Sequence, residues 1–182
     1  FELCPPDVAL PGWQDNPRDD SGMDYPGQRC PAPAASTFKW NFVPPDSGEI
    51  EFAERSVVGL KPSRICHLGI SRTFQIVRPF MELTVLQNVM VGAFVRTERY
   101  AEAERRAKDV LARFGLSARV DVPAASLNVA ERRRLELARA LASQPALLLL
   151  DEVISGLNAT EVAAFLELLR SVAREGVTIL FI

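Results

Sequence analysis

The hydrophobic and polar positions divide the chain into an aperiodic beginning and a periodic remainder. Residues 1–41 hold many prolines and scattered charges, and neither a period of 2 nor a period of 3.6 persists there. Because strands and helices bury one face through such periods, we expect this segment to be irregular. Residues 42–182 carry the regular patterns, and we expect them to form one folded domain.

The periodic part predicts an alternation of strands and helices. Residues 49–52 alternate between polar and apolar side chains, which is typical of a half-buried strand. Apolar side chains recur at helical spacing over residues 83–93 and again over residues 103–114. Gly115 follows the second of these helices, at the position where a C-terminal cap is expected.

Two later helices each have a sequence signal for their first turn. Asn128 stands three residues before Glu131, and Asn158 stands three residues before Glu161. At this spacing the two side chains can form a capping box, in which each accepts a hydrogen bond from the backbone N–H of the other residue. We therefore expect helices to begin after Asn128 and after Asn158, and the second of them to end near Gly176.

Two apolar runs flank the last predicted helix. Residues 146–150 and residues 177–182 are almost entirely apolar, and each is only long enough for a strand. A run without polar alternation is typical of a strand that is buried on both faces of a parallel sheet. Strand, helix and strand in this order predict a right-handed parallel crossover, so the fold class is α/β.

The first apolar run is followed directly by Asp151 and Glu152. An acid at the carboxyl end of a parallel strand lies at the edge where α/β sheets bind ligands. In nucleotide-hydrolysing proteins such an aspartate helps to hold Mg²⁺, and a glutamate beside it is placed to polarise the attacking water. A solvated acid after a buried strand is also common where no ligand binds, so both interpretations stay open at this point.

Composition argues against several classes of protein. A net charge of −2 gives no basic surface for nucleic acid. No apolar run reaches the roughly 20 residues that cross a bilayer, and no secretory signal is visible, so a role at a membrane needs a membrane-embedded partner. Cys4, Cys30, Cys66 and His67 lack the spacing of zinc ligands, and we expect reduced thiols.

Three segments around the acidic pair resemble motifs of ABC-transporter ATPases, in the order in which that family has them. Residues 127–142 resemble the signature segment with the helix that follows it. Residues 69–75 resemble the Q-loop, and residues 155–158 resemble the D-loop. The resemblance covers residues 42–182 and implies a P-loop NTPase-like ABC ATPase core, with a helical subdomain inserted at about residues 81–137.

The resemblance also implies roles for individual residues, and with them the cofactors ATP and Mg²⁺. Asp151 would hold Mg²⁺, Glu152 would activate water, and Gln75 would reach both the metal and the water. The start of the signature helix would face the γ-phosphate bound by the opposite subunit of a head-to-tail dimer, because a helix N-terminus offers free N–H groups to an anion. The residues implied at that helix start are Asn128, Ala130 and Glu131.

The sequence departs from the family pattern near two of these motifs. The Ser-Gly-Gly core of the signature segment reads Asn128-Val129-Ala130, and the absence of glycine restricts close approach of the backbone to phosphate. Val153 stands where the family usually has proline.

The phosphate-binding loop of the family, G-x-x-x-x-G-K-[ST], has no counterpart in this sequence. Residues 30–38 stand roughly in its place, where Ser36 and Thr37 match the end of the loop and Ser36 would be a Mg²⁺ ligand. No lysine precedes these hydroxyls, no glycine lies in the stretch, and Pro31 and Pro33 each remove a backbone donor. We therefore expect ATP to bind very weakly.

Within the family the sequence resembles the ATPase subunits of branched-chain amino-acid importers, through residues 69–75, 78–80, 83–89, 135–141 and 156–158. This implies a subunit that moves two membrane permease subunits by closing on ATP and opening after hydrolysis. Its ATPase partner would be a second copy or a paralogous subunit, and a periplasmic binding protein would act indirectly. The implied location is cytoplasmic, peripheral on the inner face of the plasma membrane.

The chain begins with Phe1 and ends at Ile182, before the histidine that the family places after its final strand. We expect a fold that is incomplete at both ends, with a first segment altered by a reading-frame error. One rival interpretation is a non-catalytic scaffold that keeps the fold and docks on permease or ATPase partners. Another is a DNA-repair or chromosome-associated ATPase, although such proteins usually carry coiled-coil or zinc insertions that this sequence lacks.

Overall fold

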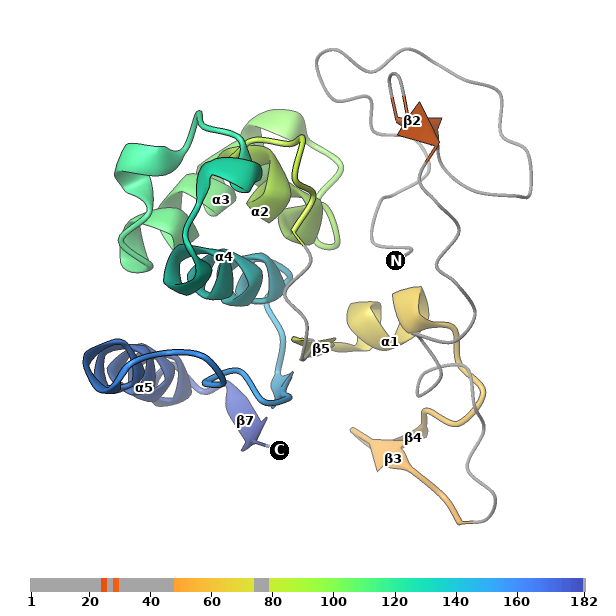
Figure 1. Cartoon of the computed structure of the whole chain (residues 1–182). Coiled ribbons are helices and arrows are strands. Elements are labelled where there is room, and N and C mark those ends of the chain that lie inside the picture. Colours follow the sequence, from red (N-terminus) through yellow and green to blue (C-terminus); the bar gives the residue numbers. More distant parts are fainter. Residues whose placement is uncertain (1–23, 26–27, 30–47, 74–78, 182) are drawn as a thin grey trace.

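The structure is a computed structural model, and it describes residues 24–25, 28–29, 48–73 and 79–181 (Figure 1). Its helices are α1 (Pro62–Leu68), α2 (Val85–Ala93), α3 (Tyr100–Arg113), α4 (Val129–Ala142) and α5 (Ala159–Arg174). Its strands are β1 (Asp24–Tyr25), β2 (Gln28–Arg29), β3 (Glu51–Phe52), β4 (Arg55–Ser56), β5 (Ile70–Arg72), β6 (Leu147–Leu150) and β7 (Thr178–Phe181).

The strands β5, β6 and β7 form a parallel sheet in that order, so the α/β fold class and the parallel pairing of the two apolar runs are confirmed. Leu148 and Leu150 are fully buried among the core side chains, whereas Leu147 and Leu149 are half-buried. The prediction of a strand fully buried on both faces was therefore wrong. The hydrophobic core packs on the face of β6 that carries Leu148 and Leu150, and the other face is only partly covered.

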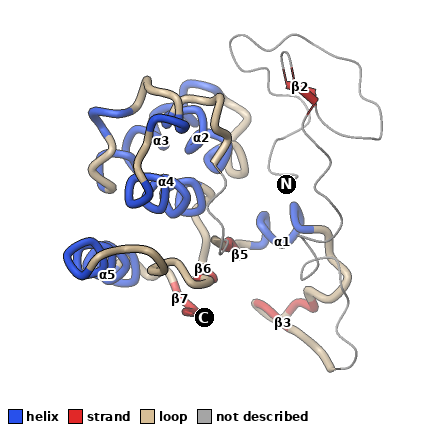
Figure 2. The backbone as a smooth tube through the Cα atoms, viewed as in Figure 1, coloured by secondary structure: helices blue, strands red, loops and turns tan. Residues whose placement is uncertain are grey.

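Helices α2, α3 and α4 pack against one another beside the sheet (Figure 2). Their apolar faces supply most of the core, which includes the fully buried Val85, Val89, Met90, Ala103, Ala107, Leu111, Leu135 and Leu137. The periodicities over residues 83–93 and 103–114 thus correctly predict α2 and α3. These two helices lie inside the segment 81–137 expected as a helical subdomain, although the limits of that subdomain stay a prediction.

The closest approach within this layer is between α2 and α4. A Cβ atom added to Gly92 would lie 2.0 Å from the carbonyl oxygen of Arg139, which is backbone and cannot rotate away. Glycine at this position therefore allows the two helices to lie in contact.

Both predicted capping boxes are present in the structure. The N–H of Glu131 donates to Oδ1 of Asn128 over 2.8 Å, and the N–H of Asn128 donates to Oε2 of Glu131 over 3.0 Å. The same reciprocal pair of bonds joins Asn158 and Glu161 at the start of α5. A third box, which the sequence pattern did not predict, begins α2.

The first half of the described chain differs from the predictions in three respects. The strand expected at residues 49–52 is present only as β3, which pairs with β4 in a hairpin. The pattern did not predict α1 or β5 at all. The strands β1 and β2 pair within the segment 1–41, where no regular structure is expected, because a ladder of two residue pairs needs no alternation of side chains.

None of the helices in the described part of the chain is long and apolar enough to cross a membrane.

Candidate functional site

The carboxyl ends of β5 and β6 lie side by side in the sheet. Arg72, the last residue of β5, is opposite Leu149 of β6. The N–H of Thr73 donates to the carbonyl of Leu149 over 2.9 Å, so the pairing continues past the end of β5. Asp151 lies two residues beyond Leu149. Because side chains alternate along a strand, this register brings Arg72 and Asp151 together on one face.

Arg72 and Asp151 form an ion pair at this edge of the sheet. Nη2 of Arg72 donates to Oδ2 of Asp151 over 2.5 Å. The exposed fractions of the two side chains are 18% and 23%, so both charges are largely removed from water. A charge in such surroundings needs a partner, and a guanidinium–carboxylate hydrogen bond is charge-assisted. The acid predicted to hold a metal is thus already neutralised from within the chain.

Glu152 lies in different surroundings from its neighbour. Its φ angle is 47°, in the left-handed region that non-glycine residues rarely adopt, and its side chain is exposed. The chain turns there, the N–H of Ser155 donates to the carbonyl of Glu152 over 3.2 Å, and Val153 is buried. The turn places the two adjacent carboxylates in different surroundings, because Asp151 is held in an ion pair and Glu152 is exposed.

The first turn of α4 carries the three residues predicted to face a phosphate. Asn128 is exposed, while Ala130 and Glu131 are half-buried. The N–H of Glu131 is used by the Asn128 side chain, and Glu131 also pairs with Nε of Arg119 at 3.4 Å. One of the N–H groups that the family resemblance assigns to an anion is therefore satisfied within the chain.

A buried arginine connects this helix with the turn after β6. Nη2 of Arg133 donates to the carbonyl of Ser155 over 3.1 Å, and Arg133 is 8% exposed. The segment that resembles a signature motif and the segment that resembles a D-loop are therefore in direct contact. The side chain of Arg133 is thus buried beside the turn that follows β6.

Gln75, Ser36 and Thr37 lie outside the residues that the structure describes. Their roles toward Mg²⁺ and phosphate stay predictions.

The described acids fit one part of a Mg²⁺ site. Mg²⁺ prefers oxygen ligands, and it is usually held by one or two carboxylates together with waters and substrate phosphates. Asp151 provides such a carboxylate at the sheet edge. Within the described ranges, no three His, Cys, Asp or Glu side chains gather closely enough to hold a metal by themselves. Asp151 can therefore take part in a shared site, in which most ligands come from a bound nucleotide and water.

Arg72 is the residue of this site that the sequence analysis did not single out. It lies within the Q-loop-like segment, but the segment was interpreted only for its glutamine. The signal that would have found it is a cationic side chain near the end of a strand that neighbours the acid-tipped strand. Using that signal requires knowledge of β5, which is only three residues long and mixed in polarity.

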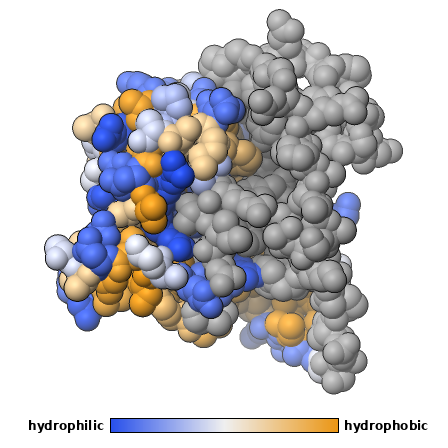
Figure 3. Space-filling view, viewed as in Figure 1, coloured by the Kyte–Doolittle hydropathy of each residue, from blue (hydrophilic) through white to orange (hydrophobic). Residues whose placement is uncertain are grey.

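A separate cleft of about 340 Å³ lies between α3, α4 and α5. Figure 3 shows apolar side chains gathered over the α5 region of the molecule. Ala130, one of the residues predicted to face a phosphate, lines this cleft together with Arg134 and Phe165, whereas Asp151 and Glu152 do not. The two acids at the carboxyl end of β6 thus lie outside this cleft.

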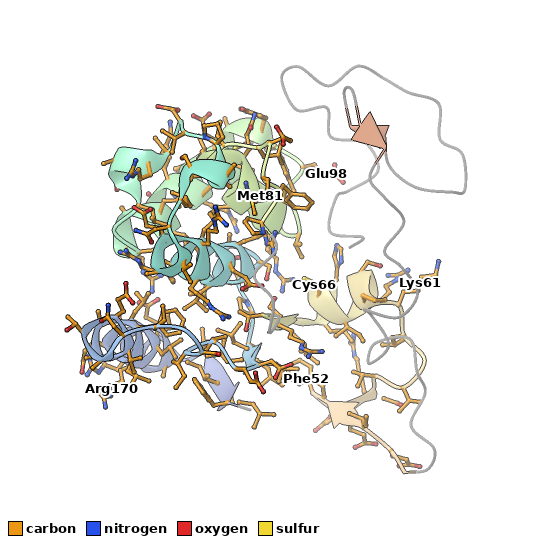
Figure 4. All side chains as sticks on the ribbon, in the orientation of Figure 1. Phe52, Lys61, Cys66, Met81, Glu98 and Arg170 are labelled. Carbon is orange, nitrogen blue, oxygen red and sulfur yellow. The ribbon has the colours of Figure 1, made fainter. Side chains whose placement is uncertain are left out.

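Cys66, on α1 (labelled in Figure 4), belongs to a buried polar cluster near β5. Its Sγ lies 3.9 Å from Oγ of Ser71, which in turn lies 2.7 Å from Oγ of Ser143. Burial raises the pKa of the Cys66 thiol, while the two serines and the charge of Arg96 act in the opposite direction. Cys66 is therefore an unreactive, structural thiol rather than a nucleophile.

Comparison with known proteins identifies the family. Residues 40–155 match the family described as ABC transporter. The high-affinity branched-chain amino acid transport ATP-binding protein LivG of Salmonella typhimurium is 37% identical over 145 residues, which cover 70% of this chain and 56% of that protein. The lipoprotein-releasing system ATP-binding protein LolD of Myxococcus xanthus is 36% identical over 138 residues, which cover 74% of this chain and 62% of that protein.

A solved structure supports the same assignment. The ATP-binding cassette MJ1267 of an ABC transporter matches with a TM-score of 0.68 and 25% identity, over 78% of this chain and 61% of that one. The predicted ABC ATPase fold is thereby confirmed. The chain spans just over half the length of the LivG protein that it matches. The chain belongs to the ABC transporter family and resembles its ATP-binding subunits of the branched-chain amino-acid type.

Proposed function

We propose that this chain is the nucleotide-binding subunit, or a part of it, that couples ATP hydrolysis to the import of branched-chain amino acids. The main support for the proposal is the position of Asp151. This residue follows β6 next to the carboxyl end of β5, and it lies inside the segment that matches the family. The identity to LivG supports the substrate class.

Each residue has a chemical task in this proposal. Asp151 would hold Mg²⁺ through its carboxylate, and the ion would supply charge neutralisation for the nucleotide phosphates. Glu152, exposed at the turn, orients and polarises a water molecule as a general base. Gln75 would reach the same water and metal. Asn128, Ala130 and Glu131 face the γ-phosphate held by the other subunit of a head-to-tail dimer, through the N-terminus of α4.

We further propose that nucleotide binding is impaired in this chain. A phosphate-binding loop wraps phosphates with consecutive backbone N–H groups and a lysine. Residues 30–38 contain two prolines, no glycine and no lysine, and only Ser36 and Thr37 match the end of such a loop. The expected result is little ATP affinity at millimolar concentration.

The partners follow from the same proposal. The chain docks on membrane permease subunits at the cytoplasmic face of the plasma membrane, and it pairs with a second copy or a paralogous ATPase. A periplasmic binding protein delivers the substrate without touching this chain. The identity to LolD makes a lipoprotein-releasing system the other candidate for the transport partner.

Titration of the purified chain with a fluorescent ATP analogue, with and without Mg²⁺, tests nucleotide binding. We expect weak binding that Asp151→Asn weakens further. Tight, magnesium-dependent binding would contradict the proposed impairment. ATP hydrolysis is then compared between Glu152→Gln and Glu167→Gln, an exposed position on α5 that undergoes the same chemical change. A loss confined to Glu152→Gln supports an ATPase.

The alternative is a non-catalytic scaffold, which the composition of residues 30–38 favours. A scaffold predicts that Glu152→Gln leaves every measurable property unchanged while permease docking persists. Co-purification with the permease subunits of an amino-acid importer, compared with those of a lipoprotein-releasing system, separates the two transport partners. Retention by the lipoprotein system alone would contradict the proposed substrate class.

A further inference from the structure

The Arg72–Asp151 pair bears on how a metal ion reaches the site. A divalent cation that binds Asp151 must use the carboxylate that Arg72 already contacts at 2.5 Å. Because both side chains are largely buried, separating the guanidinium from the carboxylate costs each of them a charge-assisted contact. Metal binding and the ion pair therefore compete for one group.

The backbone geometry fixes where this competition takes place. Arg72 is held in register by its pairing with Leu149, and the N–H of Thr73 anchors the chain just beyond it. The movable part is thus the arginine side chain, not strand β5. Glu152 is turned out of the strand by its positive φ angle, and Arg72 contacts Asp151 as its partner at this edge.

We propose that Arg72 is an intramolecular counter-ion of Asp151 that opposes the binding of a divalent cation to the same carboxylate. The inference deepens the proposed function, and it rests on that function because it takes Asp151 as the metal-holding carboxylate. A metal ion then binds Asp151 more weakly, because its binding free energy is reduced by the free energy that the ion pair loses.

The test measures Mn²⁺ binding to the full chain without nucleotide, by the loss of the free-ion EPR signal. Mn²⁺ is suitable because it takes the same oxygen ligands as Mg²⁺. We expect Arg72→Gln to bind Mn²⁺ about tenfold more tightly than the unchanged chain, and Arg72→Lys to be intermediate because lysine lacks the planar fork. Asp151→Asn combined with Arg72→Gln should abolish the gain.

Arg170→Gln is the matched control. It makes the same change in net charge on α5, where Arg170 pairs with Glu167 on the surface, away from β5 in Figure 4. This variant should leave the Mn²⁺ affinity unchanged. An equal gain in Arg170→Gln would assign the effect to net charge and overturn the proposal. Unchanged affinity in Arg72→Gln and Arg72→Lys, with both folded, would overturn it as well.

The lysine variant keeps the test decisive if the glutamine variant fails to fold, since it retains a cation beside Asp151. Failure of the counter-ion proposal can also be distinguished from failure of the proposed function. ATP binding with no effect of Arg72 on the metal would refute the counter-ion and leave the ATPase standing. A gain in Mn²⁺ affinity without any ATP hydrolysis would support the counter-ion and contradict the proposed ATPase activity.

Discussion

At the scale of single residues, two effects of opposite sign meet at Gly92. Replacing glycine by alanine inside a helix normally stabilises it by about 1 kcal/mol. Here the added Cβ would lie 2.0 Å from the backbone oxygen of Arg139, so α2 and α4 must separate. Overpacking of this kind costs about 1–3 kcal/mol. We expect Gly92→Ala to lower the free energy of unfolding in urea denaturation.

The exposed Ala163 on α5 provides the control for Gly92. Ala163→Gly removes a methyl group at an exposed position, so the expected cost is the propensity difference of about 1 kcal/mol. A stabilised Gly92→Ala variant would mean that α2 and α4 are not in contact at this point.

Because of the Cys66 thiol, we expect the stability of the fold to decrease as the pH rises into the alkaline range. Burial raises the pKa of this thiol in the folded state, so at high pH the unfolded chain loses its proton first. The stability that the neutral thiol contributes is fully present below the pKa of the thiol in the unfolded chain, about 8.5. It is lost as the pH rises through the pKa of the thiol in the folded chain. We expect urea midpoints to fall between pH 8 and pH 10, and to fall less in Cys66→Ala. An identical pH slope in both proteins would contradict a buried neutral thiol.

Arg72 illustrates how far residue chemistry could be predicted from the sequence. Asp151 and Glu152 are recognisable because an apolar run ends in acids, which is a local pattern. Arg72 and Asp151 are 79 positions apart in the sequence, and the register of β5 against β6 brings them together. A local pattern does not contain that register. The same reasoning applies to Gly92, whose significance depends on the contact with α4.

At the scale of elements, prediction succeeded where the signal lies within a few residues. The boxes that begin α4 and α5 need only an Asn and a Glu three positions apart, and both formed as expected. Strand β5 was missed because its three residues include a serine and an arginine, and it becomes a strand through its pairing with β6. Helix α1 was missed because it spans only seven residues, too few for a convincing period.

The two matched boxes allow structure and function to be separated. Asn128→Ala and Asn158→Ala each remove the side chain that accepts an N–H bond at the first turn, and each should cost about 1 kcal/mol of unfolding free energy. Denaturant titration of both variants measures this. If the N-terminus of α4 faces a nucleotide, only Asn128→Ala should also weaken any nucleotide-dependent association of two chains. Equal effects on association would contradict a special role for α4.

At the scale of the whole molecule, one arginine ties the helical layer to the region of the sheet. Arg96 follows α2 and donates to the carbonyl of Ser143 over 2.7 Å and to that of Gln144 over 3.4 Å, in the segment between α4 and β6. It also donates to the carbonyl of His67, at the end of α1, over 2.9 Å. Three segments that are distant in sequence therefore meet on one guanidinium group.

Removing this group should loosen the connection between the layers more than it weakens either one. Arg96→Met keeps much of the apolar stem and deletes the three hydrogen bonds, of which the one to the carbonyl of Ser143 is partly buried. The expected loss is about 1–3 kcal/mol. Arg170→Met, which breaks only a surface pair, should cost under about 1 kcal/mol. Hydrogen exchange provides the local readout, since the N–H groups of Ala146 and Leu147 donate to the carbonyl of Gly69 at the entrance to β6. We expect these two N–H groups to exchange faster in Arg96→Met while the interior of α4 stays protected. Uniformly faster exchange along the chain would show that Arg96 contributes to global stability without a specific connecting role.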